Sequence, residues 1–444
     1  MNSRWISRIV LVVLAVAAAS PGRGQAPGAE GLTLSKAVAL ALERAPQMAA
    51  SRAARAEGTA SANLARDAFH PYAFVSTSPG YTYGLPGQVV GQVPAIASVE
   101  IRQTIYDAGR RSAQYQSEAS ASALDAALEQ TCRSTVEATV ASYARTYLDA
   151  ALVDAARRRF AAAEAMAGRV QALFDEGRRT ELDVERAALQ AARARQKVLD
   201  AESDRDLSEL ELKRLIGWPG SSPLRLAGDP DAVIPELKET ENLPAALAAD
   251  PTLQSLGREL QLLGKSAELE SKRWLPVIAA SAQYQRLAKF NNYDDYYVSF
   301  NPDSVAIGVS VMLPVWTGGR FEDGRSQARA RLDRAEADMR ARQSDVAMSV
   351  RRTEAAAARA IAEKSLSRRA RGIADQSRSA EEMLVREGRS EPTALDERDM
   401  ALADSDEEAA RASLDAVLER VRLLSLRGEL ATALLGSEPP CRIQ

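Results

Sequence analysis

The sequence is poor in the residues that build metal sites, cofactor sites and aromatic cores. Its 444 residues include 2 cysteines, 1 histidine and only 5% aromatic residues. Cys132 and Cys441 lie far apart and belong to no spaced set, so the cysteine count predicts neither a disulfide framework nor a zinc site. The one histidine, His70, cannot supply a metal-binding cluster, and it lies beside a proline at a helix-to-strand boundary. We therefore expect no enzyme activity and no metal or cofactor.

Charge of one sign is also lacking. Lysine and arginine number 57 and aspartate and glutamate 60, which gives a net charge of −3 at pH 7. This balance does not predict a nucleic-acid partner, because phosphate backbones are bound by an excess of basic residues. Alanine dominates the apolar fraction, so we expect long solvated surfaces instead of one large core.

Long hydrophobic runs are absent after the N-terminus. The run from Ile9 to Ala19 follows Arg4 and Arg8 and precedes small residues. It is shorter than the ~20 residues that a membrane-spanning helix needs. The pattern predicts a secretory signal peptide over residues 1–26. An uncleaved membrane anchor is the alternative.

The rest of the chain repeats one plan twice. When the stretches that begin at Leu34 and Leu243 are aligned, Pro46 falls over Pro251 and Pro71 over Pro276. Two copies at so long a period indicate a duplicated domain. The predicted organisation is a first repeat over 27–216, a Pro/Gly-rich connector over 217–244, a second repeat over 245–436 and a tail over 437–444.

Each repeat is expected to contain a helix, two strands and a long helical hairpin. Residues 109–176 and 319–387 contain no proline, and their apolar residues recur three or four apart. At ~1.5 Å per residue each stretch would reach on the order of 100 Å. Gly177 and Gly388 then interrupt the pattern, as glycines that end helices do. The fold class is therefore mainly α with a small β part.

Four segments alternate between apolar and small or polar residues, as strands do. One row of one such segment is apolar, and we expect it to face lipid, although a protein core is also possible: Val305, Ile307, Val309, Val311 and Leu313. Another segment has a polar row, which we expect to face a lumen: Glu100, Arg102 and Thr104. Each segment has about the length that a tilted strand needs to cross a bilayer.

Four strands are too few to close a membrane barrel, so a sheet in a membrane requires several copies of the chain. Two copies would give eight strands, whose interior side chains fill, whereas three would give twelve and leave an aqueous pore. The alternative is a soluble periplasmic coiled-coil adaptor or scaffold, in which the strands form a small closed domain.

At this level of detail the sequence resembles the TolC-like outer-membrane efflux family. The similar stretches are "LTLSKAVALALERAPQM" in the first helix, "FHPYAFVSTS" and "WLPVIAASAQY" before the strands, "IYDAGRR" and "LPVWTGGR" after them, and the tips "EGRRTELDVERAA" and "EGRSEPTALDERDMA". No single motif is diagnostic, but their order and duplication are specific.

The resemblance implies a homotrimer with a twelve-stranded outer-membrane barrel and a periplasmic α-helical tunnel. It implies docking to a periplasmic adaptor protein and, through it, to an inner-membrane pump or ABC transporter that supplies the energy. The channel would belong to an efflux or type I secretion system. The substrate is not encoded in any residue pattern of this sequence.

The resemblance also implies roles for residues at the hairpin tips. Candidates for a ring of gate carboxylates are Asp396, Asp399 and Asp183, with ordinary solvated helix charges as the alternative. In the motif alignment the second tip carries two extra residues and Pro392. Candidates for contact with the adaptor are Gly177, Arg178, Gly388 and Arg389, which would also form the turns.

Overall fold

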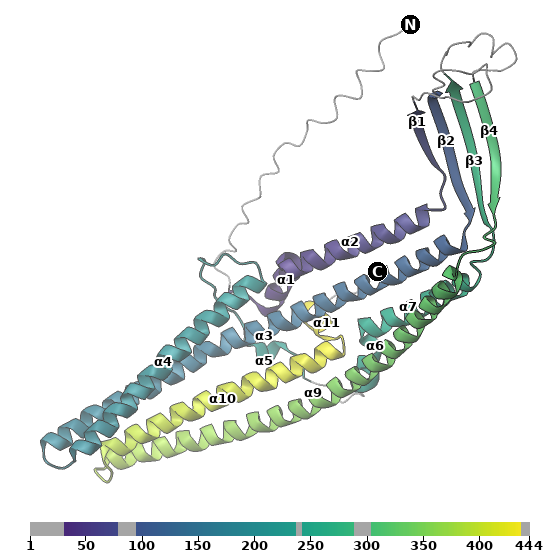
Figure 1. Cartoon of the computed structure of the whole chain (residues 1–444). Helices are drawn as coiled ribbons and strands as arrows, with labels where there is room; N and C mark the ends of the chain where they lie inside the picture. Colours follow the sequence, from purple (N-terminus) through teal and green to yellow (C-terminus); the bar gives the residue numbers. More distant parts are fainter. Residues whose placement is uncertain (1–30, 79–94, 237–241, 288–302, 437–444) are drawn as a thin grey trace, which may run out of the picture.

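The computed structural model describes residues 31–78, 95–236, 242–287 and 303–436. The predicted signal peptide and the predicted tail lie outside these residues. The described chain is a long, mainly helical wall with a small sheet at one end (Figure 1). None of the described helices combines the length and the hydrophobicity of a membrane-crossing helix.

The sheet has four antiparallel strands in the order β1-β2-β3-β4. They are β1 (Tyr72–Ser78), β2 (Ala95–Tyr106), β3 (Val277–Leu287) and β4 (Asp303–Met312). The central pair, β2 and β3, joins the two halves of the chain. In the part of the chain that the structure describes, β1 and β4 each have one strand neighbour, so the sheet is open at both edges.

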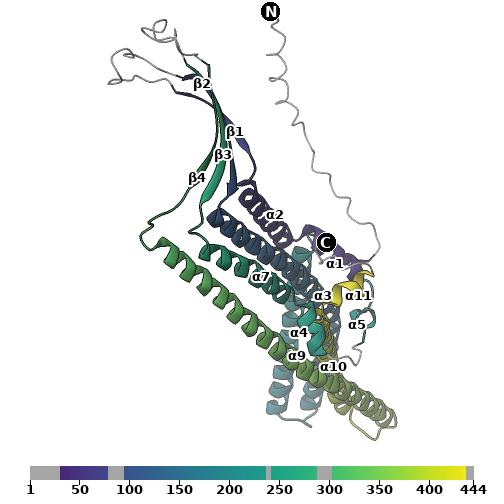
Figure 2. The same cartoon turned by 90° about the vertical axis from the view of Figure 1, so that its right-hand side faces the viewer.

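Each strand is connected to a helix of the wall. These helices are α2 (Pro46–Asp67), α3 (Ala108–Asp175), α7 (Pro251–Ser271) and α9 (Arg320–Arg386). The helices lie side by side in the order α2, α3, α7 and α9, which is also the order of the strands connected to them (Figure 2). The wall is therefore one layer that passes from strands to helices.

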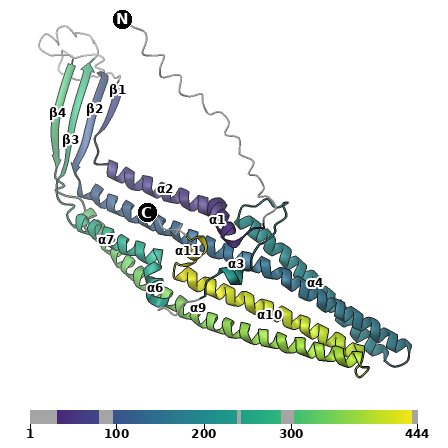
Figure 3. The same cartoon turned by 180° about the vertical axis from the view of Figure 1, so that it is seen from behind.

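The far half of the wall is built by two helical hairpins. The helices α3 and α9 are 68 and 67 residues long, which confirms the predicted long helices. They return as α4 (Glu181–Leu215) and α10 (Pro392–Leu426). The contacts give the order α4-α3-α10-α9, with the two outer helices at the edges (Figure 3).

The largest buried core lies midway along the wall, where α1 (Leu34–Arg44) and α11 (Leu430–Leu435) cover α3. Tyr143 is fully buried, and its hydroxyl lies 3.0 and 2.8 Å from the carbonyl oxygens of Leu32 and Ala227. The core members with at most 1% exposure from the long helices are Val136, Val140, Tyr143, Ala144, Leu212, Val417 and Val421.

The connector between the repeats packs on this core. Ile234 is 2% exposed, and Trp218, Leu224 and Leu226 contact the core from its rim. Cys132, also in the core, is disulfide-bonded, a bond that the sequence analysis did not predict. The one other cysteine of the sequence lies outside the described residues.

Candidate functional site

One face of the sheet is mostly apolar across all four strands, with Gln103 of β2 as a polar exception. Cross-strand partners share a face, and the register aligns Val75 with Val99, and Ile101 with Ala282 and Ile307. The predicted lipid-facing residues of β4 lie on this face with exposed fractions from 64% to 82%: Val305, Ile307, Val309 and Val311. The prediction that Leu313 belongs to this strand is corrected, because β4 ends at Met312 and Leu313 lies just beyond it.

The opposite face is mostly polar or small, although β1 places Tyr72 and Phe74 on it, opposite Arg102 and Glu100. Glu100 and Arg102 form an ion pair there and lie opposite Gln283 and Ser281 of β3. Thr104 is 9% exposed and accepts a hydrogen bond of 3.1 Å from the Arg110 guanidinium. The register therefore puts the three predicted lumen-facing residues on one face, away from the apolar row. The medium that each face meets stays a prediction.

The two hairpin tips have the same backbone geometry. Gly177 and Gly388 adopt left-handed φ angles of 74° and 70°. In each tip the residue after the glycine, Arg178 or Arg389, donates its N–H to a helix carbonyl at 2.8 Å, and the glycine N–H bonds the next carbonyl. This is the Schellman ending of a helix, which a glycine accommodates without strain. Nothing lies within 4 Å of where a Cβ of either glycine would be.

The tips differ where the returning helix begins. Thr180 and Asp183 form a reciprocal capping box at the start of α4, whereas α10 begins at Pro392 with no side-chain cap. Five residues separate the helices in both tips. The two extra residues therefore belong to the first turn of α10, and Ala394, not Asp396, stands where Asp183 stands in α4.

The three gate candidates all have partners within the chain. Hydrogen bonds from the Thr180 backbone and hydroxyl lower the pKa of Asp183. Asp396 is 4% exposed and forms an ion pair with Arg169 of α3. Asp399 accepts a hydrogen bond of 2.9 Å from Arg378 of α9. The structure therefore does not bring the three carboxylates together within one chain.

Sequence reasoning missed a set of ion pairs that joins the hairpins. In each of these ion pairs a cation of the first hairpin contacts an anion of α10 or of its N-cap: Arg158–Asp406, Arg159–Asp404, Arg169–Asp396, Arg179–Glu391 and Lys197–Glu407. The acidic run from Asp404 to Glu408 is visible in the sequence. Knowing which helix lies beside α10 would have been needed to identify its partners.

A second missed feature ties the connector to the second hairpin. Asp231 lies in α5 (Pro230–Val233) and accepts bonds of 2.5 Å from Lys364 of α9 and 2.6 Å from Arg420 of α10. Burial by itself raises the pKa of Asp231, but the hydrogen bonds from Lys364 and Arg420 outweigh it, so the pKa is lowered.

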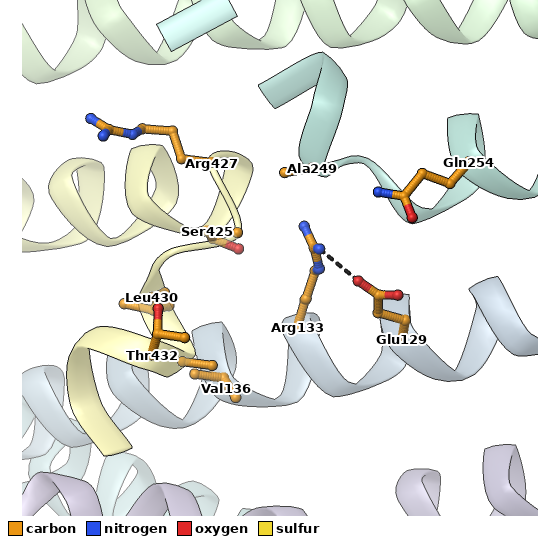
Figure 4. A pocket seen from close by; sticks show the side chains of 11 residues that line it. Glu129, Arg133, Val136, Ala249, Gln254, Ser425, Arg427, Leu430 and Thr432 are labelled. Atoms are coloured by element: carbon orange, nitrogen blue, oxygen red, sulfur yellow. Dashed lines mark hydrogen bonds and ion pairs between the residues drawn. The ribbon is translucent and has the colours of Figure 1, made fainter. Parts of the chain in front are cut away.

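A pocket of about 280 Å³ lies near the middle of the wall, between α3, the α6–α7 junction and α11 (Figure 4). The short α6 (Asn242–Ala249) contributes Ala249 to its lining. Arg133 projects into the pocket and pairs with Glu129 at 2.6 Å. Ser425 donates to Glu137 at 2.8 Å. These polar groups satisfy one another, and no cluster of three metal-ligating side chains occurs among the described residues.

The sequence profile of a family described as outer membrane efflux protein matches residues 37–218 and 242–429. No curated protein matches the sequence.

Several solved outer-membrane channels share the fold. The CmeC channel of Campylobacter jejuni is 14% identical, with a TM-score of 0.74 over 89% of this chain and 86% of that chain. VceC of Vibrio cholerae is 16% identical, with a TM-score of 0.68 over 90% and 96% of the two chains. The MtrE channel of Neisseria gonorrhoeae, in its open state, is 15% identical, with a TM-score of 0.70 over 89% of each chain.

The family match covers both halves of the chain and includes the sheet, the two hairpins and most of the central core. This match agrees with the family resemblance that the motifs at the strand ends and hairpin tips indicate. The chain belongs to the family of outer membrane efflux proteins.

Proposed function

We propose that three copies of the chain close into a tube that conducts substrates passively out of the cell. The observation that carries this proposal is the open sheet, with an exposed apolar face and a polar face. A lipid-facing sheet with free edges leaves backbone groups without hydrogen bonds, so the edges β1 and β4 must pair with other copies. Three copies supply twelve strands, enough for a water-filled lumen.

In this assembly the apolar row of β4 meets lipid, and Glu100, Arg102 and Thr104 line the lumen. The helical wall extends the tube into the periplasm, because every strand is connected to a wall helix. No step of the conduction is chemical. The energy comes from an inner-membrane pump or ABC transporter.

The hairpin tips contact the periplasmic adaptor. Arg178 and Arg389 are exposed at the ends of the two hairpins, with 61% and 69% of their side chains accessible. The space beside Gly177 and Gly388 admits a close backbone approach by a partner chain. The equal tip geometry supports two equivalent docking sites in each copy.

Asp399 and Asp396 act as gate carboxylates near the tips, and Asp183 contributes through the cap of α4. For them to ring the entrance, the pairs with Arg378 and Arg169 must loosen as the hairpins move. The variants Asp399→Asn and Asp396→Asn should then reduce the preference for cations in single-channel recordings, since each removes three charges from a trimer. Unchanged selectivity in both variants would show that these residues act only as ion-pair partners and not as a gate.

Planar-bilayer recording of the purified protein tests the function itself. The tube predicts discrete conductance steps and a trimer that dissociates on heating. The alternative, a soluble scaffold with a small closed β-domain, finds no support in the family match or in the open sheet. A protein released by osmotic shock as a stable monomer, without conductance, would exclude the tube.

A further inference from the structure

The edge helices of the wall each expose a row of large apolar side chains that no described element covers. The rows matter for the proposed trimer because α4 and α9 are the free edges of its far half. Exposed fractions lie between 51% and 68% on α4 and α9, for Leu189, Leu199, Leu207 and Leu210 on the first and Leu366, Ile373 and Met383 on the second. Leu182 and Met348 extend the two rows.

The rows point away from the chain's own wall. Over the same stretch of α9 the buried residues are Ala357, Ala360 and Ser367, which mark the side that faces the wall. Leu366 and Ile373 are seven residues apart, with Arg369 between them at helical spacing, so they share the opposite face. An apolar row of this length in water is typical of a surface that another protein covers.

A row of ion pairs fixes the relative height of the two edges, that is, the position of their residues along the long axis of the wall. Arg157 of α3 bonds Glu202 of α4 at 2.6 Å, and the next residue, Arg158, bonds Asp406 of α10 at 2.7 Å. Asp406 also bonds Arg371 of α9 at 2.5 Å. Glu202 and Arg371 therefore lie at nearly the same height on opposite edges of the wall.

Counted from these two residues, the apolar side chains of the edges coincide in height. Leu207 and Leu366 are each five residues nearer the sheet. Leu199 and Ile373 are three and two residues nearer the tips. The outer pair, Leu189 with Met383, differs by one residue, which is ~1.5 Å along a helix.

The charges of the two edges are complementary over the same heights. Residues 199–211 of α4 contain six acidic residues and one basic residue. Residues 361–373 of α9 contain four basic residues and one acidic residue. Some of these charges pair within the chain, including Asp206 with Arg205 and Arg368 with Asp231, but the side chains of Asp206 and Arg368 stay 64% and 65% exposed.

We propose that α4 of one copy packs antiparallel on α9 of the next copy, with Leu207 against Leu366 and Leu199 against Ile373. Rotation about the tube axis leaves every height unchanged, so a cyclic assembly brings these edges together without a shift. The proposal rests on the proposed trimer and specifies its seam. The acidic segment of α4 then lies against the basic segment of α9.

Cysteine cross-linking tests the seam in the full-length protein in outer membranes. Leu207→Cys combined with Leu366→Cys should yield covalent dimers and trimers with a short bismaleimide. Leu207→Cys with Met383→Cys is the matched control, because these positions differ in height by seventeen residues, or about 25 Å. It should leave the chain monomeric on a denaturing gel.

A charge exchange provides a second readout that does not depend on thiols. Arg369→Glu should lower the temperature at which the trimer dissociates, and adding Asp206→Arg should restore it. If native mass spectrometry finds trimers but the Leu207/Leu366 pair does not cross-link, or the control pair cross-links equally, the seam is wrong and the trimer stands. If no trimer forms in the unmodified protein, the proposed function itself fails.

Discussion

At the scale of single residues, Asp231 connects distant parts of the chain. Its carboxylate joins the connector to both helices of the second hairpin. Lys364 and Arg420 are each 15% exposed, so few water molecules are available to replace Asp231. A carboxylate that satisfies two poorly solvated cations contributes more to the free energy of unfolding than a surface ion pair does.

We expect Asp231→Asn to lower the free energy of unfolding by about 1–3 kcal/mol at pH 7, because two charged hydrogen bonds lose their anion. The pKa of Asp231 is lower in the folded protein than in the unfolded chain. Its stabilisation is therefore present above the unfolded pKa of about 4 and is lost as the pH falls through the folded pKa. Thermal unfolding across pH 2–7 measures this effect.

The matched control for Asp231 is Asp375→Asn, an exposed carboxylate on α9. It should change the melting temperature little at any pH. Equal melting curves for Asp231→Asn and the unmodified protein at pH 7 would contradict the role assigned to Asp231.

One glycine just beyond the end of α9 and one within it make a second residue-scale test. Gly388 has a φ of 70°, so Gly388→Ala should destabilise the protein by about 1–2 kcal/mol through backbone strain alone. Gly372 lies within the helix with nothing near its Cβ position, so Gly372→Ala should stabilise it by about 0.5–1 kcal/mol. Denaturant titration compares the two, and a shared sign would show that the tip conformation does not require glycine.

At the scale of elements, β4 allows its two faces to be compared within one strand. Val309→Arg places a charge on the apolar face, where a barrel in lipid would lose about 2–4 kcal/mol near the bilayer midplane. Ala306→Arg places the same charge on the face of Glu100 and should be tolerated. The yield of heat-dissociable trimer in outer-membrane fractions measures the difference. Equal yields would argue that the apolar face does not meet lipid.

The helices and strand faces could be predicted because they depend on local periodicity. The absence of proline and the spacing of three and four predicted α3 and α9, and strict alternation predicted the faces of β2 and β4. The alignment of Asp183 with Asp396 was wrong, because it matched the letters "LD" and not the residue that starts each helix. Thr180 caps α4, while Pro392 begins α10, so the same letters fall at different turns.

At the scale of the whole molecule, Asp406 connects the two hairpins by bonding Arg158 and Arg371. We expect Asp406→Asn to loosen the hairpins, since both arginines lose their anion. Spin labels at Arg178→Cys and Arg389→Cys, diluted to one labelled copy per assembly, should show a broader distance distribution. The control Glu336→Gln affects a pair within α9 at 3.9 Å and should leave the distribution unchanged.

Long-range pairings were beyond the reach of the sequence. Nothing local indicates that β2 lies beside β3, although Val99 and Tyr284 are partners. The ion pairs of Asp406 and Asp231 likewise depend on which helices are neighbours. Those neighbours are fixed by packing around Tyr143 and the rest of the central core, which assembles residues from both halves.

The free edges of the sheet have a consequence for the newly exported polypeptide. A bare strand edge is a template for any other extended chain, and this one adjoins an apolar surface. Since β2 pairs with β3, the sheet cannot form until most of the protein has been synthesised. If the proposed trimer forms, a single subunit is prone to aggregate before its edges pair with those of other copies, and rapid capture by a holding chaperone would protect it in that interval.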